Sequence, residues 1–299
     1  MKVAILGGAG YLGSVIYTEL INKGVTVDIY DNLMFCDEFA ESHEVKVCDM
    51  LKTGIDYTKY DKIVWCMDID VPEFYSMVES KAYINKNIKR FKELSEKLKD
   101  KLVWVTDYVV LTLKDPYEEM LSKKFDIAHK NKIGIVTIPS LYGPSPRMRF
   151  DTITNKMIAT AIIESVIYVE DWMDTVNVQS VAVAGKTTAQ FVIDGKEPNV
   201  EFLTMSMIEL AHIVKSAFGE KILVLFSEQR MSLNGTRGQL TKYDKDTEFS
   251  IENSIKYMLA GIEHGVVDSI VKDMYNNSRI VSNYVSTGNM HTFVDSLAR

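Results

Sequence analysis

The strongest constraint on the fold is a regular alternation of apolar segments and helical stretches in the first half of the chain. Six apolar segments have the length and composition of strands: Val3–Leu6, Val25–Tyr30, Val45–Cys48, Lys62–Cys66, Leu102–Thr106 and Ile133–Ile138. The first, fourth and fifth of these segments are each followed by a stretch with apolar residues at helical spacing. Strands that alternate with helices form βαβ units, which build a parallel sheet covered on both faces. The sequence therefore predicts an α/β fold with a doubly wound parallel sheet.

The alternation stops after Pro144 and Pro146, and helices and short strands then follow without a regular order. We therefore predict a first domain over residues 1–150 and a smaller mixed α/β region over residues 151–299. In open α/β sheets, ligands bind at the carboxyl ends of the strands. The second region is thus expected to supply a substrate pocket over that edge.

Composition narrows the class of partner. The chain has 34 Lys and Arg residues against 41 Asp and Glu residues, a net charge of −7, which argues against nucleic acid. The longest apolar run, Leu102–Leu113, contains Asp107 and is too short to span a membrane. Lys2 leads directly into the first strand, so we expect no signal peptide. Three cysteines and five histidines, without ligand spacing, favour a cytoplasmic protein with no metal site.

A glycine-rich turn follows the first strand and precedes an amphipathic helix. Gly7, Gly10 and Gly13 have the spacing G-x-x-G-x-x-G, which lets a diphosphate approach the backbone and the N–H groups of the helix. Asp31 ends the second strand, where a carboxylate accepts hydrogen bonds from ribose hydroxyls and repels a 2′-phosphate. These features predict a Rossmann-type dinucleotide site that prefers NAD to NADP.

These residues resemble the extended short-chain dehydrogenase/reductase family, specifically its NAD-dependent nucleotide-sugar epimerases and dehydratases. The resemblance also rests on Asp31-Asn32-Leu33, Asp49-Met50, Asn87 and Leu141-Tyr142-Gly143-Pro144. It implies that NAD is bound by a set of residues from the strand ends and one helix: Gly7, Gly10, Tyr11, Leu12, Gly13, Asp31, Asn32, Asp49, Met50, Cys66, Met67, Lys124 and Leu141.

The same resemblance implies an activity and an assembly. Members oxidise a sugar carbon of a nucleotide sugar by transient hydride transfer to NAD. They form homodimers through two long helices, which correspond here to stretches near Ala82–Leu98 and Glu118–Lys130. A segment near residues 174–190 is expected to return to the sheet of the first domain.

The catalytic half departs from the family pattern. Thr106 matches the residue that orients the sugar hydroxyl, and Asp107 beside it is similar to the acid of the 4,6-dehydratases. The family base is the Tyr of Tyr-x-x-x-Lys. Alignment on Pro116 puts Met120 at the Tyr position and Lys124 at the Lys position, where it would also contact the nicotinamide ribose. An alternative register places Glu119 there.

Three explanations of the missing Tyr stay open. Asp107 or Tyr108 acts as the acid/base, Tyr117 moves into the site, or the site binds NAD without turnover. The candidate catalytic residues are therefore Thr106, Asp107, Tyr108 and Lys124. A plain carbonyl reductase is a further alternative.

The arginine with which family members clamp the substrate diphosphate is also absent from its usual place, the stretch from residue 173 to residue 180. The sequence offers four other arginines for that charge: Arg147, Arg149, Arg230 and Arg237.

Overall fold

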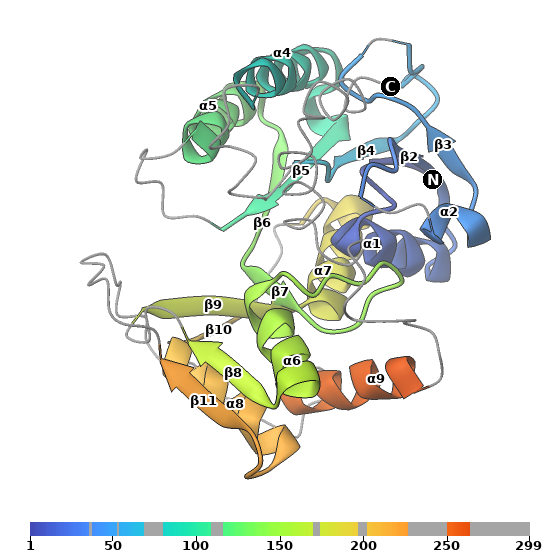
Figure 1. Cartoon of the computed structure of the whole chain (residues 1–299). Helices are drawn as coiled ribbons and strands as arrows, with labels where there is room; N and C mark the ends of the chain where they lie inside the picture. Colours follow the sequence, from blue (N-terminus) through green and yellow to red (C-terminus); the bar gives the residue numbers. More distant parts are fainter. Residues whose placement is uncertain are drawn as a thin grey trace.

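The computed structural model describes residues 1–35, 38–52, 54–68, 80–108, 116–169, 174–196, 202–226 and 250–263. Within these ranges, six parallel strands form one sheet in the order β3-β2-β1-β4-β5-β6 (Figure 1). The strands are β1 (Lys2–Leu6), β2 (Thr26–Asp31), β3 (Val45–Val47), β4 (Lys62–Trp65), β5 (Leu102–Asp107) and β6 (Gly134–Ile138). The doubly wound α/β fold predicted from the alternation is confirmed.

The central strand β1 explains where ligands can bind. It pairs with β2 on one side and with β4 on the other, so the chain reverses its winding direction at β1. The carboxyl ends of strands on either side of such a reversal leave a crevice. Val3, Ala4, Ile5 and Leu6 are fully buried, as expected of a strand covered on both faces.

Two hydrophobic cores lie on opposite faces of the sheet. Val3 and Ile5 pack with α1 (Tyr11–Asn22) and α7 (Val181–Asp194), whereas Ala4 and Leu6 pack with α4 (Ser80–Leu98) and α5 (Pro116–Asn131) (Figure 1). The alternation of side chains along a strand separates the two sets. Two short helices, α2 (Glu38–Ser42) and η1 (Lys99–Lys101), complete this part.

The close packing of α7 on α1 depends on a glycine. A Cβ atom at Gly185 would lie 2.5 Å from Cγ1 of Val15, so only glycine allows this approach. The segment 174–194 thus packs against the first half of the chain, while the division into two domains at residue 150 stays a prediction.

The later elements form a separate layer below the sheet in Figure 1. Strands β7 (Ser140–Tyr142), β9 (Thr175–Ser180) and β10 (Leu203–Ser206) make a mixed sheet, and β8 (Val166–Val169) pairs with β11 (Leu223–Phe226). The helices are α6 (Ile153–Glu164), α8 (Met207–Phe218) and α9 (Ile251–Glu263). Ser206 and Glu209 form a capping box that fixes the start of α8.

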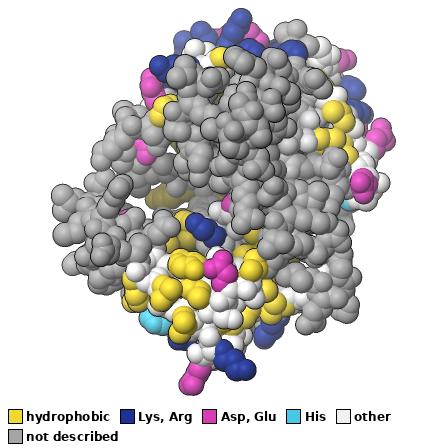
Figure 2. All heavy atoms as spheres, viewed as in Figure 1, with side chains coloured by type: hydrophobic (Ala, Val, Ile, Leu, Met, Phe, Trp, Pro, Cys, Tyr) yellow, Lys and Arg dark blue, Asp and Glu magenta, His cyan; other side chains and the backbone are white. Residues whose placement is uncertain are grey.

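The face of the molecule shown in Figure 2 carries both charged and hydrophobic side chains. Figure 2 shows basic side chains at the top, over α4 in the orientation of Figure 1, and hydrophobic side chains below. The exposed hydrophobic residues of the lower part include Tyr168, Leu223, Leu225 and Phe226. In the part of the chain that the structure describes, no helix has the length and apolarity to cross a membrane. Arg230 and Arg237 lie outside the described residues.

Candidate active site

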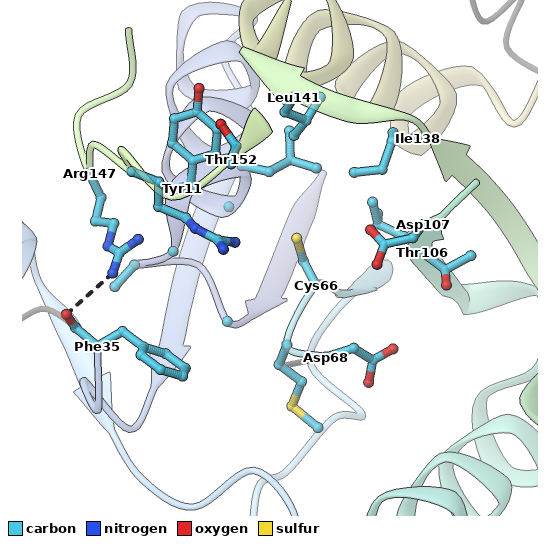
Figure 3. A pocket seen from close by; sticks show the side chains of 18 of the residues that line it. Tyr11, Phe35, Cys66, Asp68, Thr106, Asp107, Ile138, Leu141, Arg147 and Thr152 are labelled. Carbon is cyan, nitrogen blue, oxygen red and sulfur yellow. Dashed lines mark hydrogen bonds between the residues drawn. The ribbon is translucent and has the colours of Figure 1, made fainter. Parts of the chain in front are cut away.

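A pocket of about 720 Å³ opens where the strands of the parallel sheet end. Residues that follow β1, β2, β4, β5 and β6 line it together with the loop after β7. Figure 3 shows Tyr11 and Arg147 on one side of this pocket and Thr106 and Asp107 on the other, with Cys66 between them. The two ends differ in chemistry.

The first end is built on the glycine turn. Gly7 has a φ of +82°, which favours glycine, and a Cβ atom at Gly13 would overlap the backbone of Gly7. Helix α1 therefore starts directly against the end of β1. Its cap residue is Gly10, so no side chain occupies the first N–H groups. These groups are available to an anion at the positive end of the helix.

Two carboxylates lie beside this turn. Asp31 is 9% exposed and accepts hydrogen bonds from the backbone N–H groups of Ala9 and Leu33, at 3.0 and 2.9 Å. Burial raises the pKa of Asp31, although these hydrogen bonds and the charge of Arg147 oppose that effect. Asp49 accepts a hydrogen bond from the backbone N–H of Leu51 at 2.9 Å.

Tyr11 ties the glycine turn to the later region. Its hydroxyl donates to the carbonyl of Gly143 at 2.6 Å and accepts from Nδ2 of Asn155 at 3.0 Å. Burial raises the pKa of Tyr11, so the phenol keeps its proton. This link fixes the loop after β7 over the pocket.

All the residues expected to contact NAD, except Lys124, line this one pocket: Gly7, Gly10, Tyr11, Leu12, Gly13, Asp31, Asn32, Asp49, Met50, Cys66, Met67 and Leu141. Most of these residues follow β1, β2, β3 or β4, which are adjacent in the parallel sheet, whereas Leu141 lies on β7 of the second sheet.

The second end of the pocket contains Thr106, Asp107 and Tyr108 from the end of β5. Thr106 is 4% exposed, and its Oγ1 has no hydrogen-bond partner among the described residues. Tyr108 is 47% exposed, and its backbone N–H donates to the carbonyl of Ile138. A buried hydroxyl without a partner, at the wall of a cavity, is suited to a polar ligand.

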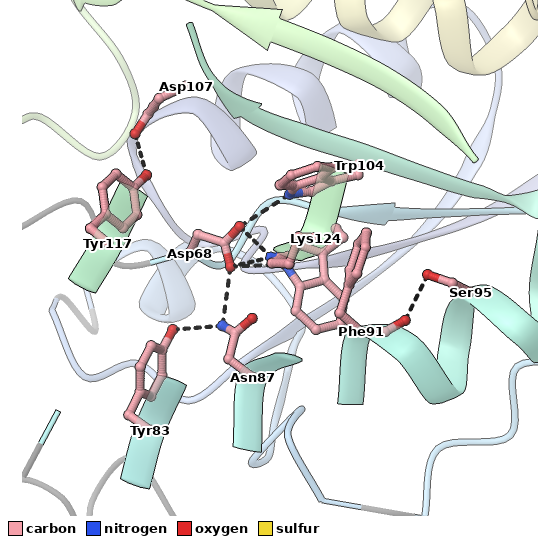
Figure 4. Close-up of polar contacts among 10 residues, drawn as sticks. Asp68, Tyr83, Asn87, Phe91, Ser95, Trp104, Asp107, Tyr117 and Lys124 are labelled. Carbon is pink, nitrogen blue, oxygen red and sulfur yellow. Dashed lines mark hydrogen bonds and ion pairs between the residues drawn. The ribbon is translucent and has the colours of Figure 1, made fainter. Parts of the chain in front are cut away.

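Tyr117 joins this end from α5. Its hydroxyl donates a hydrogen bond to the carboxylate of Asp107 (Figure 4). Pro116 begins the helix, a position that proline favours. Met120, which stands at the family Tyr position, is fully buried in the core.

Lys124 does not line the pocket. Its side chain is fully buried, with Nζ 2.7 and 2.5 Å from the two carboxylate oxygens of Asp68. Nζ also lies 4.6 to 4.8 Å from the ring centres of three aromatic residues, Trp65, Phe91 and Trp104. The contact of Lys124 with the nicotinamide ribose expected from the family resemblance stays a prediction.

Asp68 was not identified from the sequence. It lines the pocket, yet both of its oxygens face inward to donors (Figure 4). Besides Lys124, the indole N–H groups of Trp65 and Trp104 and Nδ2 of Asn87 donate to it, each at 3.1 Å. Burial favours the neutral acid, but Lys124 and these donors outweigh burial and lower the pKa of Asp68. The available signal was an acidic residue in the loop that follows an apolar strand, β4.

Two arginines line the pocket at the end that carries the glycine turn. Arg147 is 2% exposed and donates to the carbonyl of Phe35 at 3.3 Å (Figure 3). Arg149 makes a two-point contact with Asp151 at 2.8 and 3.0 Å. Among the described residues, no group of three or more His, Cys, Asp or Glu is arranged to hold a metal ion.

Several solved structures share this fold. The NAD-dependent NDP-hexosamine 5,6-dehydratase TunA, involved in tunicamycin biosynthesis, is 15% identical with a TM-score of 0.70, over 90% of this chain and 99% of that chain. An epimerase from the methanogen Methanothermobacter thermautotrophicus is 16% identical with a TM-score of 0.69, over 88% of this chain and 93% of that chain.

A mutant UDP-glucuronic acid 4-epimerase from Bacillus cereus, in complex with a fluorinated UDP-glucuronic acid and NAD, is 17% identical with a TM-score of 0.68. That match covers 88% of this chain and 99% of the epimerase. No protein-family model matches this chain, and no curated protein sequence matches it either. At these identities the likeness shows a shared fold over nearly the whole chain, the one that the sequence resemblance implied.

Proposed function

We propose that this protein is an NAD-dependent enzyme of the extended short-chain dehydrogenase/reductase family. It acts as an epimerase or dehydratase on a nucleotide sugar, through transient hydride transfer from a sugar carbon. One observation carries the proposal: a single pocket joins the glycine turn and Asp31 at one end to Thr106, Asp107 and Tyr117 at the other. The structural neighbours named for NAD and nucleotide sugars support it.

The residues at the first end fit NAD. The glycine turn lines the pocket at the N-terminus of α1, where no side chain caps the first N–H groups, so a diphosphate can accept hydrogen bonds from them. Asp31 can accept hydrogen bonds from ribose hydroxyls, and Asp49 and Met50 border the adenine side. When bound, NAD supplies the acceptor for the hydride of the sugar carbon.

The second end provides groups for the sugar. Thr106 can hydrogen-bond a sugar hydroxyl, since its Oγ1 is buried without a partner among the described residues. Toward the glycine turn, the buried guanidinium of Arg147 supplies positive charge, and that of Arg149 lies beside it in the pocket lining, paired with Asp151. Guanidinium groups bind diphosphates, so Arg147 and Arg149 are candidates for binding the diphosphates of NAD and of the nucleotide sugar.

The proposal includes a cytoplasmic homodimer. Helices α4 and α5 lie together on the outer side of the sheet (Figure 1), and the groove between them is lined by Ile88, Ile127 and several charged residues. A second copy of the same pair would form a four-helix interface, as the family resemblance implies.

The test combines cofactor binding with turnover. Purified protein should bind NAD, measured by titration calorimetry, and should change UDP-glucuronic acid, UDP-glucose or dTDP-glucose into a new sugar, measured by proton NMR. Absence of NAD binding would contradict the proposal. Binding without any turnover would favour a non-catalytic NAD protein, and net consumption of NADH with a small carbonyl compound would indicate a reductase.

A further inference from the structure

The loop between β7 and α6, residues 143–152, carries the arginines that are candidates for diphosphate binding. Arg147, Arg149 and Thr152 of this loop line the pocket. Figure 3 shows Arg147 on the same side of the pocket as Tyr11, the residue that begins α1. The position of this loop therefore decides where the guanidinium groups lie in the pocket.

Tyr11 holds the loop at two points. Its hydroxyl donates to the carbonyl of Gly143 at 2.6 Å, and its backbone carbonyl accepts from Oγ of Ser145 at 2.6 Å. The Ser145 Oγ also accepts from the backbone N–H of Arg147 at 3.3 Å. Because Tyr11 is the first residue of α1, its own N–H is one of the groups that a helix leaves to an anion. One residue therefore connects the glycine turn with the loop.

Asn155, in the first turn of α6, holds the same parts from behind the pocket. It is fully buried and does not line the pocket. Its Oδ1 accepts from the backbone N–H of Gly143 at 3.1 Å. Its Nδ2 donates to the Tyr11 hydroxyl at 3.0 Å and to the carbonyl of Arg149 at 2.8 Å, so both amide hydrogens are used. This side chain thus fixes the positions of α1 and the loop relative to each other.

We propose that Asn155 is a positioning residue that couples the binding of NAD to the binding of the nucleotide sugar. When NAD is bound, the first turn of α1 is fixed at the diphosphate, and Tyr11 and Asn155 extend this restraint to the loop. The loop then loses less conformational freedom when its arginines bind the second diphosphate, so each ligand strengthens the binding of the other. This inference rests on the proposed function.

The first experiment measures the coupling as a ratio of two dissociation constants. Isothermal titration gives the Kd of NAD for the full chain alone and in the presence of saturating UDP or dTDP. In wild-type protein, the nucleoside diphosphate should lower the Kd of NAD by about 5-fold or more, and NAD should lower the Kd of the nucleoside diphosphate by the same factor. Equal Kd values in the two conditions overturn the inference.

Two variants and a control locate the coupling. Tyr11→Phe should bring the ratio close to one, because it removes the hydroxyl that Asn155 binds. Asn155→Ala should do the same, and if this variant does not fold, Tyr11→Phe decides alone. The matched control is Tyr60→Phe, since Tyr60 is buried, does not line the pocket, and bonds through its hydroxyl with Tyr30 at 2.7 Å and with Asp28. A wild-type ratio in Tyr11→Phe, or a lost ratio in Tyr60→Phe, overturns the inference.

The second experiment needs no nucleoside diphosphate. Hydrogen exchange measured by mass spectrometry follows the backbone amides of residues 143–151 in the full chain. NAD alone should slow their exchange in wild-type protein, and should slow it less in Tyr11→Phe. Exchange in this loop that does not respond to NAD overturns the inference, whatever the titrations give.

The two proposals fail in different ways. Wild-type protein that binds no NAD contradicts the proposed function and the coupling with it. Protein that binds NAD but neither UDP nor dTDP contradicts the proposed substrate class, and hydrogen exchange then decides the role of Tyr11 and Asn155. Binding of both ligands with a ratio of one contradicts only the coupling.

Discussion

At the scale of single residues, the site depends on where charges are buried. Lys124 and Asp68 are enclosed together, and each satisfies the other at 2.7 and 2.5 Å. Removing one member of such a pair leaves an uncompensated charge in an apolar environment, which costs far more than losing an exposed pair. The neighbouring Lys123–Glu119 ion pair on α5 is exposed, so it can be compared with the buried Lys124–Asp68 pair.

We therefore predict that Lys124→Met destabilises the fold by about 3–5 kcal/mol, because Asp68 remains buried without its cation. Urea unfolding followed by circular dichroism measures the difference. Lys123→Met, on the adjacent position of α5, should change the unfolding midpoint little, since both partners are solvated. Equal effects of the two variants would contradict the enclosure of Lys124.

A second residue-scale prediction concerns acid stability. Burial opposes ionisation of Asp28, but hydrogen bonds from Lys46, Tyr60 and Lys2 outweigh it and lower the pKa of Asp28 to about 2. A carboxyl with a depressed pKa in the folded state stabilises the fold above its ordinary pKa, about 3.9, and this contribution is lost as the pH falls toward 2.

Between pH 4 and pH 2, the free energy of unfolding should thus fall more steeply with decreasing pH in wild-type protein than in Asp28→Asn. Urea titrations at several pH values in this range give both slopes. Parallel slopes would show that Asp28 does not hold its charge in the folded state.

At the scale of elements, the turn between β1 and α1 positions the dinucleotide end. Gly13→Ala should lower NAD affinity at least 10-fold, because the new Cβ overlaps the backbone of Gly7 and displaces the start of α1. Isothermal titration with NAD measures this. Gly24→Ala is the control: Gly24 has a φ of +75° but nothing within 4 Å of a Cβ, so alanine there strains the backbone without touching the pocket. Normal NAD affinity in Gly13→Ala would refute this account.

At the scale of the whole molecule, two apolar residues, Ile88 and Ile127, line the groove between α4 and α5 on the outer side of these helices. If two copies pair there, Ile127→Asp should shift the sedimentation coefficient from dimer to monomer. Ile163→Asp, on an exposed position of α6, should leave it unchanged. A monomeric wild-type protein would exclude the dimer.

The sequence alone determined the strands, the glycine turn and Asp31, because these depend on local rules. Strand burial follows from consecutive apolar residues, and a turn that brings a helix onto a strand end requires glycine at fixed spacing. The residues expected at the dinucleotide end converged for the same reason: in a parallel sheet, all carboxyl ends meet at one edge.

Only the tertiary structure decided the other end of the pocket. The family resemblance implied a role for Lys124 at the ribose, and the fold encloses this residue with Asp68, which lies in the loop after β4, 56 positions away. It likewise brings Tyr117, outside the expected Tyr-x-x-x-Lys spacing, onto the carboxylate of Asp107. Ion pairs and hydrogen bonds of this kind depend on which elements pack together and how far a side chain reaches. The spacing of residues along the sequence predicts neither of these.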